Sequence, residues 1–287
     1  MATFASEGVF MDAKLKCPRC GSADVKANGS TRFLCHGCGR TFSRSTSTVM
    51  SSKKLAADKL WLMVNMMVNG CKLKAISDAV GISSRTAYVW RMKVCAVAFE
   101  IQKSAMLSGK VWIDEKLVPV NEGMLYRKTG RFRLRGVSRN QAVIACGVDS
   151  EGNRFAFVAW RGHITERECI ETYGRHIAEG STIVHDGIKG HAGLIRRLSA
   201  KEELHRSSDP DYHKAMQPID SFCSEIEHWT EVHRGSRTEY LRLNVAWIAF
   251  RPSINEANIK DKIDQLVSMC YQTKATFRVK DRYKLDK

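Results

Sequence analysis

The spacing of apolar residues changes from helical to strand-like near the middle of the chain. From about Leu55 to Val68 apolar residues recur at helical spacing, and this run ends at Asn69-Gly70, a suitable helix C-terminus. Beyond Gly109 the apolar residues form short runs rich in β-branched and aromatic side chains, which favour strands. The pattern therefore predicts a helical part followed by a mixed part.

The segment 74–90 predicts a helix-turn-helix. It contains a short helical stretch, Gly81 in the turn, one apolar residue and then Ser83 as the cap of a second helix. Such a second helix presents its outward side chains to the major groove of DNA. The outward residues expected to contact DNA are Ser84, Arg85, Tyr88 and Arg91. A helical hairpin without a DNA-binding role has the same pattern, so the neighbouring modules must decide between the two.

The C-terminal half predicts a mixed α/β layer. Strands are expected at 111–120, 141–148, 154–160 and 181–185, and helices at 165–178, 190–198 and 218–229. Residues 149–153 have the composition of a hairpin turn between two of these strands. This order is typical of a mixed sheet covered by helices. A moderately helical stretch follows at 254–270.

Four of the ten cysteines have the spacing of a structural zinc site. Two CxxC motifs are separated by 14 residues, and a glycine follows each motif. Four thiolates complete the tetrahedral coordination of zinc, and short strands at 32–34 and 40–42 would complete a zinc ribbon. The expected ligands are Cys17, Cys20, Cys35 and Cys38. The other six cysteines are scattered, as buried core thiols are, and no secretory signal precedes the motifs, so we expect a reducing compartment.

The charge balance predicts a polyanionic partner. The chain has 46 Lys and Arg residues against 30 Asp and Glu, a formal net charge of +16, and nucleic acid is the default partner of such a chain. Residues 127–139 carry six basic side chains and no acid, which favours phosphate binding over a merely solvated face. The phosphate contacts expected there are Arg127, Lys128, Arg131, Arg133 and Arg135. No apolar run approaches the about 20 residues of a membrane span, so no membrane partner is expected.

Asp114 and Asp186 lie where a charge is unusual. Asp114 is inside an apolar strand, and Asp186 directly follows the strand that ends at His185. A buried carboxylate is costly unless it is paired, hydrogen-bonded or bound to metal, and carboxylates at neighbouring strand ends can converge on Mg²⁺. A third acid is expected from the helix 218–229, where the candidates are Asp220, Glu225 and Glu227. Asp186 alone could equally cap the following helix, and side-chain alternation gives His185 a structural place on the opposite sheet face.

The order of these modules resembles that of bacterial insertion-sequence transposases of the ISXO-like type, which join a zinc ribbon, a helix-turn-helix and an RNase H-like DDE catalytic domain. Three motifs carry the resemblance, together with a C-terminal helical signature at 234–241. The motifs are Ile113-Asp114-Glu115, Val184-His185-Asp186-Gly187 and Ile219-Asp220-Ser221-Phe222-Cys223-Ser224. The resemblance covers residues 17 to about 250. It implies a multi-domain α+β protein with a zinc ribbon at 12–44, a helix-turn-helix domain at 52–104, an RNase H-like mixed α/β catalytic domain at 108–251 and a basic C-terminal tail at 252–287.

The resemblance implies a DNA transposase that binds the terminal inverted repeats of an insertion sequence and catalyses Mg²⁺-dependent strand cleavage and strand transfer. Asp114, Asp186 and Asp220 would hold two Mg²⁺ or Mn²⁺ ions, zinc would be structural, and the protein would act on element ends and target DNA as a homo-oligomer in the cytoplasm, associated with the nucleoid. His191 and His213 are further candidates for phosphate contacts. Two alternatives stay open: a DNA-binding regulator with a catalytically degenerate transposase domain, and an RNase H-like repair nuclease.

The third acidic position departs from the family pattern. Members of the family carry Glu or Asn there and Lys seven residues on, whereas this chain has Asp220 and then Glu227. Seven residues place the two acids about 10 Å apart along a helix, and two-metal centres span only about 4 Å, so one ion pair cannot easily use both. Either Asp220 is the ligand and Glu227 replaces the DNA-contacting Lys, or Glu227 is the ligand and Asp220 caps the helix. We favour the first assignment.

Overall fold

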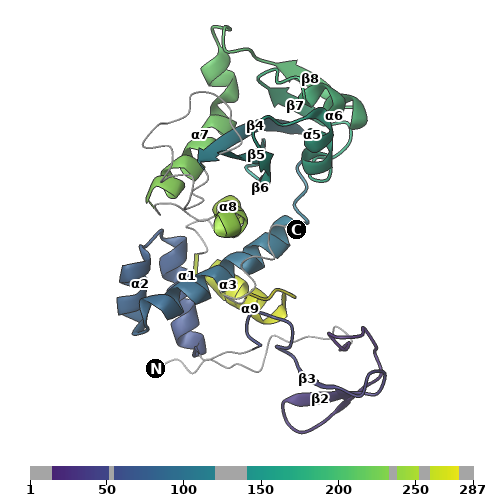
Figure 1. Ribbon diagram of the computed structural model, residues 1–287, viewed down its shortest axis with the longest axis vertical. Helices are drawn as coiled ribbons and strands as arrows, with labels where there is room; N and C mark the ends of the chain where they lie inside the picture. The colour runs from purple at the N-terminus through teal and green to yellow at the C-terminus, as the bar shows by residue number, and fades with distance from the viewer. Residues whose placement is uncertain (1–14, 52–54, 120–140, 233–237, 252–258, 278–287) are drawn as a thin grey trace, which may run out of the picture.

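A computed structural model describes residues 15–51, 55–119, 141–232, 238–251 and 259–277. Figure 1 shows three parts along the long axis of the molecule: a small three-stranded sheet, a group of helices and a five-stranded sheet flanked by helices. The architecture is mixed α/β, as the sequence predicts.

The small sheet is antiparallel and carries the cysteine motifs. It consists of β1 (Val25–Ala27), β2 (Arg32–Cys35) and β3 (Thr41–Ser43) in that order. Gly21 and Gly39, which follow the two motifs, have φ angles of +79° and +66°, a conformation that favours glycine. Because these turns reverse the chain directly after each CxxC motif, both motifs meet at one end of the sheet.

The group of helices contains the predicted helix-turn-helix. Its first three helices are α1 (Ala57–Val68), α2 (Leu73–Val80) and α3 (Ser84–Gln102), and α2 and α3 form the predicted helix-turn-helix. Helix α2 ends at Gly81 with φ 67°, and the Ser83 side chain caps α3 by accepting a hydrogen bond from the Thr86 N–H at 3.1 Å. The predicted helices, the turn glycine and the serine cap are therefore confirmed.

The C-terminal residues 259–277 are not a tail. Helix α9 (Ile259–Gln272) buries Ile263, Leu266 and Cys270 in the core of the helical group. The indole N–H of Trp61 on α1 donates to Asp264 Oδ1 at 2.7 Å. The helical stretch predicted at 254–270 is present as α9 from Ile259. Its description as part of a basic tail from residue 252 does not hold for this stretch, because the apolar stripe of α9 packs on α1 and α3, far earlier in the chain. Residues 278–287 lie outside the described part of the chain.

The large sheet has two antiparallel and two parallel strand pairs. Its strands are β4 (Lys110–Pro119), β5 (Gln141–Asp149), β6 (Arg154–Arg161), β7 (Thr182–His185) and β8 (Lys201–Leu204). They lie in the order β6-β5-β4-β7-β8, with β4–β5 and β5–β6 antiparallel and β4–β7 and β7–β8 parallel. Strand β8 was not predicted, because its sequence Lys-Glu-Glu-Leu is that of a polar edge strand without apolar alternation.

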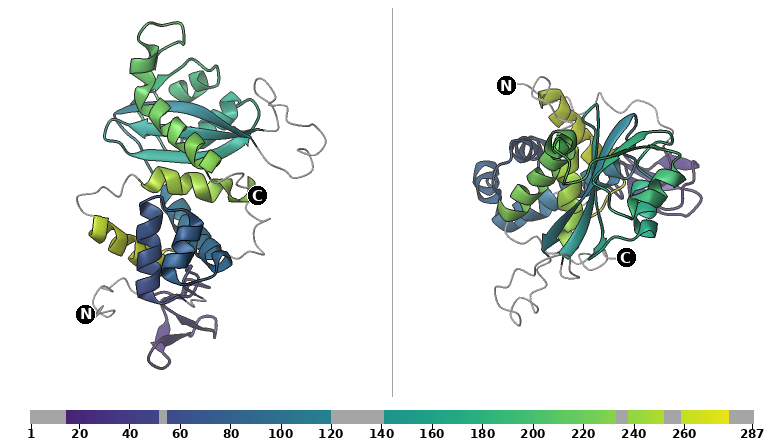
Figure 2. Two further views of the ribbon diagram at one scale, coloured as in Figure 1. Left: turned by 90° about the vertical axis from the view of Figure 1, so that its left-hand side faces the viewer. Right: turned by 90° about the horizontal axis from the view of Figure 1, so that it is seen from above.

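Helices cover both faces of this sheet, as Figure 2 shows. Helices α5 (Glu166–Tyr173) and α6 (His191–Arg197) lie on one face, and α7 (Tyr212–Val232) and α8 (Thr238–Phe250) lie on the other. Alternation along β4 follows this division. Ile113 belongs to the core beneath α5 and α6, whereas the neighbouring Trp112 packs on the α7 side.

Helix α8 joins the helical group to the large sheet. Leu243 and Trp247 are buried in the helical core, and Leu241, Val245 and Ile248 are buried against the sheet. Because α8 is apolar on both sides, it is buried between two layers. Figure 2 shows it lying between the sheet and α3. The helical group and the sheet therefore share one packed element.

Candidate metal centre

The backbone places Asp114 and Asp186 level with each other on adjacent parallel strands. Trp112 of β4 pairs with Val184 of β7, and Asp114 and Asp186 each lie two residues beyond that pair. Two residues on, alternation returns the Asp114 side chain to the face of Trp112, which is the α7 face. Asp186 directly follows the last residue of β7, and its Oδ1 accepts a hydrogen bond from the Ile188 N–H at 3.1 Å. Neighbouring strands are separated by about 4.8 Å, so the two carboxylates lie side by side at the ends of the parallel pair.

Helix α7 brings Asp220 to the same face. Its first turns are tied to β4 by a hydrogen bond of 2.8 Å from the indole N–H of Trp112 to the Ala215 carbonyl. Ile219 and Phe222 are fully buried against the sheet, so Asp220 between them is held beside β4. The sulfur of Cys223, three residues after Asp220, lies 3.9 Å from Asp114 Oδ2. The three predicted acids thus lie near enough for the charges of Asp186 and Asp220 to act on Asp114.

Electrostatics show that these acids act on one another. Burial, followed by the nearby charges of Glu115, Asp186 and Asp220, raises the pKa of Asp114 to about 7. Burial also raises the pKa of Asp220, against the opposing influence of His213 and Lys116. A metal-free cluster of carboxylates repels itself, and a bound cation relieves that repulsion.

The donor types of the three acids suit a hard divalent cation. Three aspartates supply only carboxylate oxygens, which Mg²⁺ and Mn²⁺ accept. Among the described residues, the groups whose donor atoms all lie within 4.8 Å of one another do not include these three acids together. Within the described part of the chain, the three acids are therefore spaced more widely than the ligands of one ion.

The other two candidate acids of α7 have different partners. Glu227 is 55% exposed and forms an ion pair of 2.6 Å with Lys116 of β4. Glu225 forms an ion pair of 2.9 Å with Arg154 and a second ion pair with Arg251. Lys116 lies two residues beyond Asp114 on the same face of β4. Glu227 therefore pairs with the ammonium group of Lys116 at the rim of the acidic cluster.

Sequence reasoning missed Glu115, which points to the opposite face. It accepts hydrogen bonds from the Tyr173 hydroxyl at 2.8 Å and contacts His191 Nε2 at 2.9 Å. His185 also lies on that face, as alternation predicted.

His191 is fully buried, so its assignment as a phosphate contact was wrong. His213 is exposed beside Asp220, which leaves its phosphate contact as a prediction. Only the adjacency of Glu115 to Asp114 hinted at a role.

The four cysteines of the ribbon converge as a zinc site requires. Their donor atoms all lie within 4.8 Å of one another, with Cys17 Sγ 3.8 Å from Cys38 Sγ and Cys20 Sγ 3.5 Å from Cys35 Sγ. Burial would raise the pKa of the Cys17 thiol, but backbone hydrogen bonds from Arg19 and Cys20 outweigh it and lower this pKa to about 6. Against a backbone hydrogen bond from Ser22, the neighbouring Cys35 thiol raises the pKa of Cys20 to about 12. The convergence of the four sulfur atoms makes the quartet compatible with structural zinc.

We expect replacement of Cys17 and Cys20 by serine to remove the ribbon zinc and to unfold the ribbon alone. Only Cys17, Cys35 and Phe42 are buried in its core, which is too little to fold without metal. Hydrogen exchange should rise in residues 15–43 and stay unchanged in β4 and β5. The control is Cys71→Ser, a half-buried thiol of the helical group. Protection that persists in the ribbon of the double variant would contradict the prediction.

Two of the four predicted groove-facing residues of α3 face inward. Ser84 and Arg85 are exposed at the start of the helix, as expected. Tyr88 stacks edge-on with Tyr240 of α8, and Arg91 is 8% exposed with its guanidinium over the ring of Trp229 on α7. The prediction that Tyr88 and Arg91 point outward was wrong, because α7 and α8 cover this side of α3.

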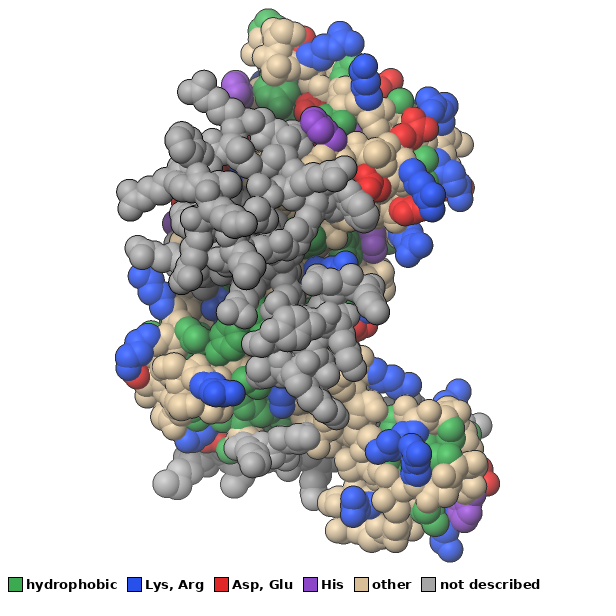
Figure 3. Space-filling view, in the orientation of Figure 1, with side chains coloured by type: hydrophobic (Ala, Val, Ile, Leu, Met, Phe, Trp, Pro, Cys, Tyr) green, Lys and Arg blue, Asp and Glu red, His purple; other side chains and the backbone are tan. Residues whose placement is uncertain are grey.

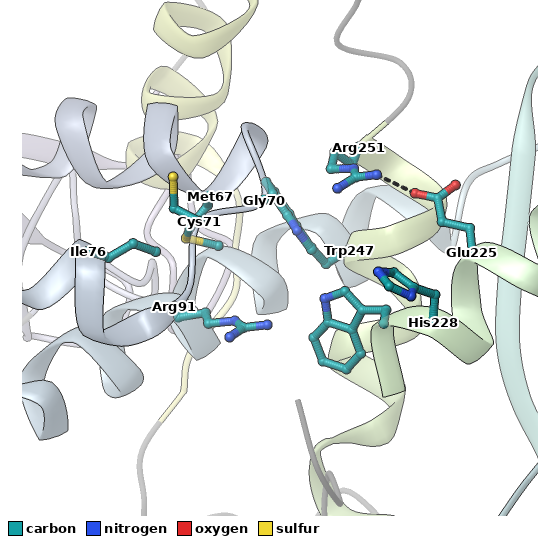
Figure 4. A pocket seen from close by; sticks show the side chains of 10 residues that line it. Met67, Gly70, Cys71, Ile76, Arg91, Glu225, His228, Trp247 and Arg251 are labelled. Carbon is teal, nitrogen blue, oxygen red and sulfur yellow. Dashed lines mark hydrogen bonds and ion pairs between the residues drawn. The ribbon is translucent and has the colours of Figure 1, made fainter. Parts of the chain in front are cut away.

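A cleft of about 250 Å³ lies where the helical group meets α7 and α8. Arg91, Trp247 and His228 face it, and the pair Glu225–Arg251 lies at its edge, as Figure 4 shows. The three acids of the sheet do not line this cleft. It marks the contact between two parts of the fold rather than the acidic centre.

The predicted phosphate-binding segment cannot be placed, because Arg127, Lys128, Arg131, Arg133 and Arg135 lie outside the described residues. Figure 3 shows Lys and Arg side chains on all three parts of the molecule on the face it presents. This distribution accords with the net charge of +16. Of the described helices, none is long and apolar enough to cross a membrane.

Comparisons with known proteins add little. No protein-family model matches the chain, and no curated protein matches it. One similar solved structure is a chain of the cryoEM structure of the simian T-cell lymphotropic virus intasome in complex with the PP2A regulatory subunit B56 gamma. The TM-score is 0.34 and the identity 11%, over 68% of this chain and 69% of that chain. A similarity of this size supports no conclusion about fold or function.

Proposed function

We propose that the protein is a metal-dependent DNA transposase, a nuclease and polynucleotidyl transferase that binds two Mg²⁺ or Mn²⁺ ions through Asp114, Asp186 and Asp220. The observation that carries the proposal is the proximity of three carboxylates from β4, the end of β7 and α7. Burial, together with the charges of Glu115, Asp186 and Asp220, raises the pKa of Asp114 to about 7. Bound divalent ions would neutralise a scissile phosphate and lower the pKa of an attacking water or 3′-hydroxyl.

The topology of the large sheet supports an RNase H-like assignment. In chain order its strands occupy positions 3-2-1-4-5, with the second strand antiparallel to its neighbours. Asp114 lies on the first strand and Asp186 follows the fourth, and these two strands are parallel neighbours at the centre of the sheet. The ends of the central parallel strands are where a site of this chemistry is built.

The chain's own residues supply orientation and exclusion of solvent. Phe222 and Ile219 fix α7 against the sheet, and this holds Asp220 opposite Asp114. Burial and the charges of the three acids raise the pKa of Tyr212 as well, so its hydroxyl stays protonated next to the centre and can donate to a phosphate oxygen. The zinc ribbon and the exposed start of α3, with Ser84 and Arg85, are proposed to bind double-stranded DNA at the element ends.

Strand cleavage and joining on defined DNA tests the proposal. The substrate is a duplex that carries the terminal inverted repeat found beside the gene, with Mg²⁺ or Mn²⁺ added. We expect a nick at the repeat end and joining of the freed 3′-hydroxyl to target DNA by a homo-oligomer. Specific binding of the repeat without any cleavage would replace the proposal by a DNA-binding regulator. Cleavage independent of the repeat would favour a repair nuclease.

The two acids of α7 should separate in activity. We expect Asp220→Asn to reduce cleavage at least 10²-fold, because a ligand of the metal centre is lost. Glu227→Gln should leave the cleavage rate within about threefold, since an exposed ion pair contributes no more than about 1 kcal/mol. The rate of a single turnover at saturating DNA reports the difference. If only Glu227→Gln abolished cleavage, Glu227 would be the third ligand.

A further inference from the structure

A second cluster of metal-ligating side chains lies behind the acidic centre, on the face of the sheet covered by α5 and α6. Its members are Glu115 of β4, Cys169 of α5 and His191 at the start of α6. The side chain of Glu115 is only 5% exposed, and Cys169 and His191 are fully buried. One donor atom from each residue lies within 4.8 Å of the other two.

The contacts around His191 direct its Nε2 toward a carboxylate. The backbone N–H of Gly187 donates to His185 Nδ1 at 3.2 Å, so this nitrogen is an acceptor. His191 Nδ1 lies 3.1 Å from the same nitrogen and must therefore carry the hydrogen between the two rings. The other ring nitrogen, Nε2, lies 2.9 Å from Glu115 Oε1. Either a proton or a metal ion therefore lies between these two atoms.

The carboxylate of Glu115 has unused coordinating capacity. Its Oε2 is buried and has no hydrogen-bond partner among the described residues. A buried carboxylate oxygen without a partner is costly. A proton shared between Oε1 and His191 would still leave Oε2 without a partner. Gly190 leaves room for the Cys169 sulfur, because the Cβ of any other residue at this position would lie only 2.9 Å from that sulfur.

We propose that Glu115, Cys169 and His191 form a second, buried zinc site. A thiolate, an imidazole and a carboxylate are the donor types that zinc prefers, and their separation fits donors placed about 2.0–2.3 Å from one ion. His185 orients the imidazole of His191 through its other nitrogen, and the Tyr173 hydroxyl lies 2.8 Å from Glu115 Oε1. Such outer contacts accompany metal-bound histidine and carboxylate side chains.

The site would fix the spacing of the two strand ends that carry the acids. Glu115 adjoins Asp114, and His185, which contacts His191, adjoins Asp186. The group His185, Asp186 and His191 also has donor atoms within 4.8 Å. However, His185 Nδ1 already accepts from the Gly187 N–H, and Asp186 Oδ1 already accepts from the Ile188 N–H at 3.1 Å. The zinc site therefore stands on Glu115, Cys169 and His191, and it does not depend on the transposase assignment.

Zinc content per folded chain tests this site. The full chain is purified without an affinity tag or added metal, and zinc is measured by inductively coupled plasma mass spectrometry. We expect two zinc ions per wild-type chain and one in a variant with Cys17, Cys20, Cys35 and Cys38 all changed to serine. Adding Cys169→Ser to that variant should remove the remaining ion, whereas adding Cys95→Ser, a buried thiol of α3, should retain it.

A variant with four ribbon serines that holds no zinc overturns the proposal, and a proton then joins Glu115 and His191. The same conclusion follows if the remaining zinc survives Cys169→Ser. Cobalt loading of the four-serine variant gives a second readout that needs no further substitution. A thiolate-to-cobalt charge-transfer band is expected in the near ultraviolet, with the intensity of a single thiolate, and its absence would also exclude the site.

Discussion

Replacement of Asp114 by Asn should abolish metal-dependent cleavage and at the same time stabilise the metal-free protein at pH 8. The first effect follows because Asp114 occupies the centre of the acidic cluster, and we expect a loss of at least 10³-fold in the cleavage rate. The second effect follows from the pKa of Asp114, which burial and three neighbouring acids raise to about 7. The same cluster that binds cations thus costs stability when it is empty.

The pH dependence has a definite sign. A carboxyl group with a folded pKa of about 7 binds its proton more tightly in the folded chain than in the unfolded chain, whose pKa is about 3.9. Metal-free stability therefore falls as the pH rises between these values, and the full cost, on the order of 1–4 kcal/mol, is present above pH 7. Asn carries no charge, so Asp114→Asn removes this cost at pH 8 and has little effect at pH 4.

Thermal unfolding in EDTA at the two pH values measures this difference. We expect the variant to melt a few degrees above the wild type at pH 8. Millimolar Mg²⁺ should raise the melting temperature of the wild type and leave that of Asp114→Asn nearly unchanged. The control is Asp261→Asn, an exposed acid in the first turn of α9. Equal melting temperatures of variant and wild type at pH 8 would show that Asp114 is not strained by its neighbours.

Replacement of Phe222 by Ala should be the most destabilising single change in α7. The ring is fully buried between the helix and the sheet, beside Ile219 and Ile226, and the guanidinium of Arg154 lies 5.0 Å from its centroid. Truncation of a buried Phe leaves a cavity and typically costs about 3–5 kcal/mol. Because Phe222 holds the helix that carries Asp220, cleavage should also become more sensitive to temperature.

Native-state hydrogen exchange localises this loss. Peptides from β4, β5 and α7 should exchange faster in Phe222→Ala, whereas peptides from the zinc ribbon should not change. The matched control is Ser221→Ala, an exposed neighbour on the same helix, for which we expect a change within about 0.5 kcal/mol. Unchanged protection in β4 would mean that α7 contributes little to the stability of the sheet.

Sequence patterns predicted the features that depend on neighbouring residues. The CxxC spacing, the turn at Gly81, the Ser83 cap and the bounds of β4 to β7 within one or two residues rest on contacts a few positions apart. Asp114 and Asp186 are singled out for the same reason, since one is a charge inside an apolar strand and the other directly follows an apolar strand. The turn chemistry and the strand alternation that place them are local.

Tertiary packing decided the rest, because the partners lie far apart in the chain. Tyr88 and Arg91 face inward only because α7 and α8 lie against α3, more than 130 residues later. The sequence of α9 predicts only a moderately helical stretch. Its apolar stripe is accounted for by its packing against α1. Glu227 looks equivalent to Asp220 along the helix, and only the position of Lys116 on β4 draws it away from the acids.

The contrast between the two aspartates and Glu115 shows where the limit lies. From the sequence alone, Asp114 and Asp186 are predicted as ligands and Glu115 is merely their neighbour. Adjacent residues of a strand point to opposite faces of the sheet. The contacts of Glu115 therefore come from α5 and α6, which cover the other face. Local sequence patterns specify which elements form and which acids are out of place. Which side chains meet depends on packing, because burial and hydrogen bonding require elements that are far apart in the chain.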